Sequence, residues 1–208
     1  MEKETLIASS GENYFFLTNE EQDVSREIKN VELDFGAESR LFGEIIFGDI
    51  YKDHKKRRYA KTGKDFNINR LCDKRPFGNR VEQGLVVSVI TPFNDAYSQY
   101  EQPRCALESM EENGSIVIKL SDIENLETEL RIYLKTEKYI SRKNDENEEI
   151  KRILRERKED NRIRKNRLME FTREMLVNAD YYAAGQKRDM DADPLTALGE
   201  ACDYLIDN

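Results

Sequence analysis

The amino-acid sequence predicts an α+β fold: a small mixed or antiparallel sheet packed with helices, followed by a long charged helix and a terminal helix. Two runs rich in β-branched residues, LVVSVIT at 85–91 and IVIKL at 116–120, predict interior strands, because neither alternates polar and apolar residues. Helical spacing of apolar residues on both sides of these runs predicts the helices. A chain of 208 residues buries roughly 70% of its unfolded surface, which is enough for a real core.

The stretch YFFLTNEEQDVSREI, which begins at Tyr14, indicates a short aromatic strand followed by a helix. Thr18 and Glu21 have the spacing of a capping box, in which each side chain accepts a hydrogen bond from the other residue's backbone N–H. The helix is predicted to extend over 19–35, since one apolar stripe follows the cap: Val24, Ile28, Val31 and Phe35. The pattern repeats in LFGEIIFGDIY and predicts a second helix over 39–51.

Two domains are predicted. The first spans 11–141 and contains helices at 19–35 and 39–51, strands near 66–71, 85–91 and 116–120, and a helix at 123–141. The second, 145–208, is a helical region whose long helix, from about 146 to 178, is roughly 50 Å long. The middle of this helix, ERKEDNR, has no apolar side chain and must project into solvent or pack on a partner through charge. A short strand and turn at 181–185 precede a terminal helix over 194–206, capped by Asp193.

Charge is distributed unevenly along the chain. The formal net charge is -8, but residues 52–80 contain eleven Lys and Arg against three Asp, a net of +8, which leaves -16 for the rest. No basic residue follows Arg188, and the last twenty residues carry six acidic side chains: Asp189, Asp191, Asp193, Glu200, Asp203 and Asp207. The basic stretch is therefore a separate electrostatic feature of the sequence.

The sequence has no apolar run near the roughly 18 residues that span a bilayer, and its N-terminus has no signal-peptide core. We therefore expect a cytoplasmic protein without a membrane partner. The three cysteines, Cys72, Cys105 and Cys202, are odd in number and widely spaced, which favours reduced thiols over a disulfide framework or a zinc site.

Searches for catalytic and cofactor motifs identify no site. Gly63-Lys64-Asp65 is not the end of a P-loop, because Asp65 replaces the Ser/Thr that holds Mg²⁺. The single histidine, His54, has no second His with which to build a metal site or a triad. Acidic residues from Asp189 to Glu200 follow the ligand spacing of a calcium loop, but Pro194 occupies the place of its Gly. We expect no catalytic residue, no metal and no cofactor in this segment.

The basic block 52–64 is the one stretch that suggests a binding function. Its cations, with Tyr59 and Phe66 nearby, have the charge and aromatic spacing of a surface that contacts phosphates. The candidate nucleic-acid-binding residues are Lys52, Lys55, Lys56, Arg57, Arg58, Lys61 and Lys64. The alternatives are a solvated loop, a loop that docks on the acidic remainder of the protein, and a site for a protein partner.

The order of several stretches resembles the interior of the large P-loop protein of bacteriophage-exclusion (BREX) systems, the BrxC/PglY family. The stretches are YFFLTNEEQDVSREI, LFGEIIFGDIY, FNINRLCDKRPFGN, LVVSVITP, LRIYLKTEKYI, ILRERKEDNR, ADYYAAGQ and ALGEACDYLIDN, and they span the chain from about Gly11 to Asn208. The resemblance implies a parent related to AAA+ ATPases, with an upstream P-loop for ATP and Mg²⁺ and with further sequence after Asn208. No Gly-Lys-Ser/Thr occurs here, so none of the family's ATP-binding residues can be assigned.

We therefore expect a non-catalytic structural or interaction segment of a phage-defence ATPase. Its expected partners are other BREX components or the rest of the parent ATPase. The alternative function is a DNA-binding module that uses the basic block 52–64.

Overall fold

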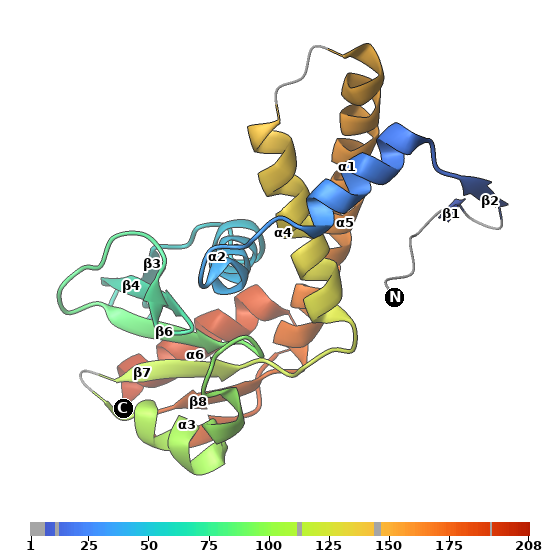
Figure 1. Cartoon of the computed structure of the whole chain (residues 1–208). Helices are drawn as coiled ribbons and strands as arrows, with labels where there is room; N and C mark the ends of the chain where they lie inside the picture. The colour runs from blue at the N-terminus through green and yellow to red at the C-terminus, as the bar shows by residue number, and fades with distance from the viewer. Residues whose placement is uncertain (1–6, 11–12, 112–113, 144–146, 192) are drawn as a thin grey trace. The chain divides into compact units, whose positions relative to one another are not determined.

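The computed structural model describes residues 7–10, 13–111, 114–143, 147–191 and 193–208 (Figure 1). The chain forms two compact units, each made of two separate stretches of sequence. Unit 1 comprises 1–35 and 127–167, and unit 2 comprises 36–126 and 168–208. The domain limits 11–141 and 145–208 stay a prediction about which pieces fold independently, and limited proteolysis would test them.

Unit 2 contains an open mixed sheet, so the predicted α+β class is confirmed. Six strands follow one another across it: β3 (Lys56–Arg58), β4 (Asp65–Cys72), β6 (Leu85–Ile90), β7 (Ser115–Lys119), β8 (Asp180–Ala183) and β9 (Gln186–Arg188), with β5 (Arg75–Pro76) paired to β4. The three central strands β4, β6 and β7 are parallel, and the outer pairings are antiparallel. The two β-branched runs form β6 and β7 at the centre of the sheet, whereas β4 has the more polar sequence DFNINRLC.

One face of the sheet packs on helices α2 (Ala37–Gly43) and α6 (Pro194–Asp207) and on the π-helix η1 (Glu44–Ile50). Strand register puts Val87, Val89, Ile116 and Ile118 on this face, and all four are fully buried. The helices contribute Phe42, Ile45, Ile46 and Ala201, which are equally buried. This face therefore forms the main hydrophobic core of unit 2.

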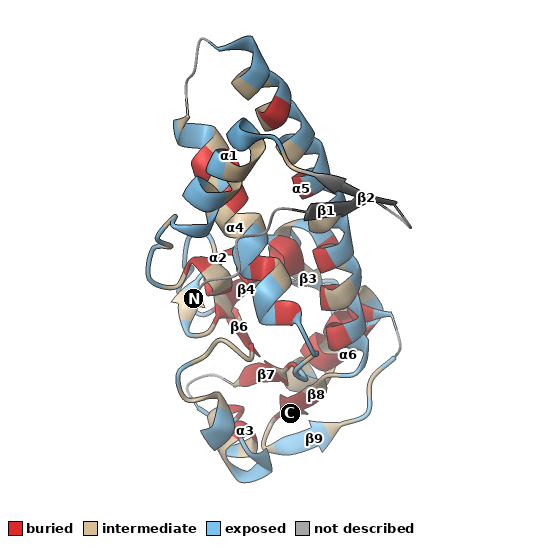
Figure 2. Ribbon diagram, turned by 45° about the vertical axis from the view of Figure 1, so that its right-hand side comes forward, coloured by how far each residue is buried: buried red, intermediate tan, exposed pale blue. Residues whose placement is uncertain are grey.

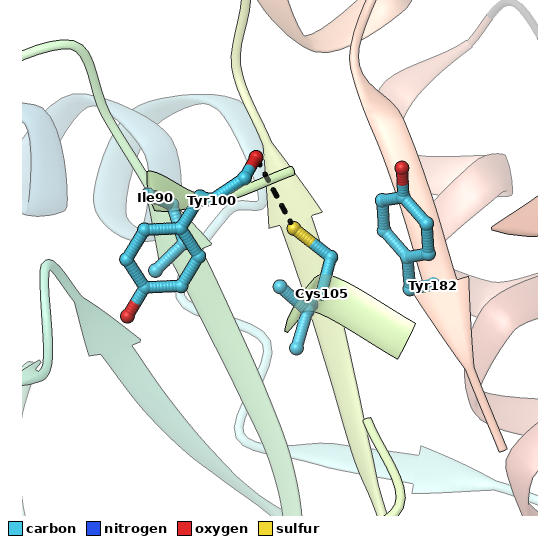
Figure 3. Close-up of a cluster of buried hydrophobic side chains, with 5 residues drawn as sticks. Ile90, Tyr100, Cys105 and Tyr182 are labelled. Atoms are coloured by element: carbon cyan, nitrogen blue, oxygen red, sulfur yellow. Dashed lines mark hydrogen bonds between the residues drawn. The ribbon is translucent and has the colours of Figure 1, made fainter. Parts of the chain in front are cut away.

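The opposite face is covered only in part, by the 3-10 turn η2 (Tyr97–Gln99) and the short helix α3 (Gln102–Glu108). Here Ile90, Tyr100, Cys105, Val117 and Tyr182 form a second apolar cluster, in which the Cys105 thiol donates to the Tyr100 carbonyl at 3.7 Å (Figure 3). Figure 2 shows β7 and β8 as largely buried strands and β9 as an exposed edge.

Unit 1 packs α1 (Asn19–Lys29) with α4 (Leu126–Arg142) and with the N-terminal part of α5 (Glu148–Val177). Its small core contains Val24, Tyr139 and Ile153, one from each helix. The N-cap of α1 has the predicted capping box, with both Thr18–Glu21 hydrogen bonds present. A short hairpin, β1 (Ile7–Ser10) with β2 (Asn13–Phe16), precedes α1.

Several elements differ in extent from their predictions. Helix α1 ends at Lys29 rather than at residue 35, and Phe35 is 78% exposed. Val31 still packs on the unit 1 core, but it lies after the end of the helix, so its apolar spacing predicted a longer helix than the one present. The segment predicted as one helix over 39–51 divides at Gly43 into α2 and η1. Helix α4 starts at Leu126, after Asn125 in the left-handed conformation (φ 64°), rather than at residue 123. No helix in the described ranges is long and apolar enough to span a membrane.

Candidate functional site

The basic block 52–64 lies in unit 2, at one edge of the sheet. The chain leaves η1 through two left-handed residues, Lys52 (φ 51°) and Asp53 (φ 54°), and then enters edge strand β3. A turn with Gly63 at φ 67° returns the chain into β4. Strands β3 and β4 therefore form an antiparallel hairpin, which presents the basic residues along the edge.

Three of the seven candidate cations are paired with carboxylates. Arg57 donates two hydrogen bonds to Asp203, from Nε at 2.8 Å and from Nη2 at 2.5 Å, and Lys61 donates to both oxygens of Asp207 at 2.8 Å. Lys55 pairs with Asp53 at 2.9 Å. Because Asp203 and Asp207 belong to α6, the acidic C-terminal helix neutralises part of the basic block.

The electrostatics of these pairs follow from their hydrogen bonds. Donation by Lys61 and by the Tyr59 hydroxyl lowers the pKa of the Asp207 carboxyl, and the same bond to Asp207 raises the pKa of Tyr59. The bidentate contact with Asp203 raises the pKa of Arg57. The contacts of Arg57 and Lys61 therefore favour the charged forms of Arg57 and Asp207, and they tie α6 to the edge of the sheet.

The other four candidates, Lys52, Lys56, Arg58 and Lys64, are exposed. Lys56 and Arg58 point to the same side of β3, because they are two residues apart on a strand. Within the described part of the chain none of the four pairs with a carboxylate. They form the residual positive surface of the basic block.

The other side chains that could bind a metal or react, a histidine, an aspartate and three cysteines, are held in structural contacts. The ring Nδ1 of His54 lies 2.7 Å from the Tyr51 carbonyl, and Asp193 caps α6 by accepting from the Thr196 N–H. All three cysteines are buried, which raises the pKa of each thiol, to about 12 for Cys202. Over the residues that the structure describes, no three His, Cys, Asp or Glu side chains are arranged to hold a metal ion.

The ends of the parallel strands are where open α/β sheets commonly bind ligands. Here the first residue after β4, Asp73, directs its carboxylate to protein groups. It accepts from the Thr91 N–H (2.8 Å), the Thr91 hydroxyl (2.7 Å) and the Ser39 hydroxyl (2.5 Å). The carboxylate therefore joins α2, the β4–β5 turn and the end of β6, and it is engaged in holding the fold.

A pocket of about 590 Å³ lies over the part of the sheet that α3 leaves uncovered. Its floor is made by alternate residues of three parallel strands: Asn69 and Leu71, Val86 and Ser88, and Ser115 and Val117. The ion pair of Lys74 with Glu108, at 3.1 Å, forms part of its wall. We did not predict this pocket, and its only sequence signal is the serine placed within each of two apolar strands, Ser88 and Ser115.

A mixed open sheet with helices on both faces defines an α+β domain. Residues 31–205 match the family described as "BREX ATP-binding protein BrxC 4th domain with six-stranded beta sheet". The chain belongs to this family and is a segment of a phage-defence BREX protein, which confirms the resemblance. The six strands from β3 to β9 that follow one another across the sheet agree with the family's description. No solved structure matches the chain.

Proposed function

We propose that this domain is a non-catalytic structural and interaction module of its parent BREX ATPase. The observation that carries the proposal is that groups capable of chemistry contact the protein itself. The Asp73 carboxylate accepts hydrogen bonds from Thr91 and Ser39, and the three thiols are buried. ATP and Mg²⁺ then bind elsewhere in the parent, and this domain's partners are other BREX components or the remainder of that ATPase in the cytoplasm.

The pairing of the basic block with α6 supports a structural role for the strongest charge feature of the sequence. Arg57 and Asp203 are separated by 146 residues, so their bidentate contact closes the C-terminal helix onto the sheet. A cation that is held in this way is not available to a phosphate, and its main effect is on stability.

The test is phosphate release from Mg-ATP by the purified 208-residue chain. We expect no release above a buffer blank, and release that persists after a further chromatographic step would overturn the proposal. Cross-linking of the same chain to its parent protein and to the other components of the system would identify the partner. Finding no cross-link to any of them would contradict the interaction role.

DNA binding by the basic block is a second candidate, because Lys52, Lys56, Arg58 and Lys64 remain exposed and without a carboxylate partner in the described structure. The variant that tests it is Lys56→Glu with Arg58→Glu, which leaves the Arg57 contact intact. A salt-sensitive shift of duplex DNA at about 50 mM salt that this variant loses would support DNA binding. The control is Arg142→Glu with Lys158→Glu, an equal charge change on exposed residues of α4 and α5. No shift by the unaltered chain would exclude this candidate.

A further inference from the structure

Unit 1 contains a cationic groove of about 450 Å³, formed by α1, α4 and α5. Five basic side chains line it, contributed by all three helices: Lys29, Arg131, Lys135, Arg157 and Arg164. Asp160 is the one acidic residue among the described residues that line it. Three helices therefore direct positive charge to one small concave surface, which sequence periodicity along a single helix does not reveal.

Pairing with carboxylates leaves part of this charge uncompensated. Arg131 pairs with Glu127 at 2.8 Å, Arg157 with Asp160 at 3.8 Å, and Arg164 with Glu129 at 3.1 Å. Lys29 and Lys135 have no carboxylate within ion-pair distance in the described residues, and the Lys135 ammonium donates only to the Lys29 carbonyl at 2.6 Å. Two positive charges thus remain at the groove, on α1 and α4.

The floor of the groove is apolar. Ile28 and Ile132 line it, and the Ile132 side chain is 38% exposed although it belongs to a helix that packs in a core. No aromatic ring lines the groove in the described structure. Single-stranded nucleic acid binds by stacking bases on aromatic side chains between basic contacts, so this combination does not favour it. An apolar floor with a basic rim instead complements a peptide that carries apolar and acidic residues.

We propose that this groove binds an acidic amphipathic segment of a partner protein. The partner's apolar side chains contact Ile28 and Ile132, and its carboxylates lie against Lys29 and Lys135. A helix with apolar residues at helical spacing and glutamates between them has this chemistry. The inference rests on the interaction role proposed above, and it names the class of partner and the surface that meets it.

The test is fluorescence anisotropy of a labelled helical peptide of about 12 residues made of Leu and Glu at i, i+3, i+4 spacing. We expect saturable binding by the full chain that weakens as salt rises. The variant Lys29→Gln with Lys135→Gln removes the two uncompensated charges and retains most of each side chain. We expect it to bind about tenfold more weakly, the loss expected when two exposed ionic contacts are removed.

The matched control is Arg142→Gln with Lys158→Gln, which changes the net charge equally on exposed residues of α4 and α5 outside the groove. It should bind like the unaltered chain, and circular dichroism should show that both variants are folded. A peptide with Ser in place of Leu tests the apolar floor and should bind more weakly by a similar factor.

Equal binding by the groove variant and the control would overturn the proposal, as would equal binding of the Leu and Ser peptides. Binding of a single-stranded oligonucleotide but not of the peptide, with the same dependence on Lys29 and Lys135, would also overturn it and assign the groove to nucleic acid. These outcomes are separate from the phosphate-release assay, which alone decides whether the domain is catalytic.

Discussion

Replacement of Asp73 by alanine is the sharpest test of how the parallel strands are held together. The Asp73 carboxylate accepts three hydrogen bonds from two buried residues, Thr91, which is 0% exposed, and Ser39, which is 5% exposed. Asp73 is also left-handed, with φ 48°, a conformation that Asp tolerates better than Ala. Asp73→Ala therefore removes the acceptors and strains the turn at the same time.

The size of the effect can be worked out from these contacts. A buried Thr91 N–H without a partner costs about 1 to 3 kcal/mol, and the two hydroxyls, which can rotate to other acceptors, add about 1 kcal/mol. Alanine at positive φ adds about 1 kcal/mol. We expect Asp73→Ala to lower the free energy of unfolding by about 3 to 5 kcal/mol. Asp73→Asn keeps one acceptor oxygen and the tolerance of positive φ, so it should lose only about 1 to 2 kcal/mol.

The assay is urea unfolding followed by circular dichroism. The free energy of unfolding and its slope against urea concentration, the m-value, are compared between variants. Asp95→Ala is the control, because Asp95 is exposed in the loop after β6 and should change stability by less than about 0.5 kcal/mol. A loss below about 1 kcal/mol for Asp73→Ala, or equal losses for the alanine and asparagine variants, would refute the assignment of Asp73 as the joint between α2, β4 and β6.

Three further predictions concern α6 and the buried thiols. An added Cβ at Gly199 would lie 2.8 Å from Arg57 Nη1. Gly199→Ala should therefore stabilise the chain by about 1 kcal/mol when Arg57 is also replaced by alanine, and by less when Arg57 is present. Equal gains in the free energy of unfolding, measured in urea, would contradict this crowding. The folded pKa of Asp207 is lowered below its ordinary value of 3.8, so its contribution to stability is present above pH 3.8 and is lost as pH falls through the folded pKa. Asp207→Asn should therefore unfold at a lower temperature than the unaltered chain at pH 7, and the difference should shrink toward about pH 2; a constant difference would contradict the assignment. Thiol titration with a disulfide reagent at about pH 8 should be slow in the native chain and complete in denaturant, since burial raises the three thiol pKa values, and fast native reaction would show that a thiol is accessible. The thiols concerned are Cys72, Cys105 and Cys202.

Local chemistry was sufficient to predict the elements that depend on neighbouring residues. The capping box of Thr18 and Glu21 places the start of α1, and Asp193 followed by Pro194 places the start of α6. The β-branched runs predict β6 and β7, because a strand buried on both faces needs apolar residues at consecutive positions. The order of such stretches along the chain was also enough to indicate the BREX BrxC family.

The candidate site was less accessible to sequence reasoning. All seven cations of the basic block are visible in the sequence, but only the fold separates Arg57 and Lys61, which bind α6, from Lys56 and Arg58, which remain exposed. The groove in unit 1 has no sequence signature at all, since its cations come from three helices.

The sequence by itself determined the capped starts of α1 and α6, the two central β-branched strands, and where charge accumulates, because these depend on residues within a few positions of one another. Only the tertiary structure decided that β8 pairs with β7, that Asp203 meets Arg57 across 146 residues, and that Lys29 and Lys135 share one groove. The physical reason is that such contacts depend on strand order and helix packing. Strand order and helix packing are set by the free energy of the whole chain, and the distance between two residues in the sequence does not tell whether they will be in contact.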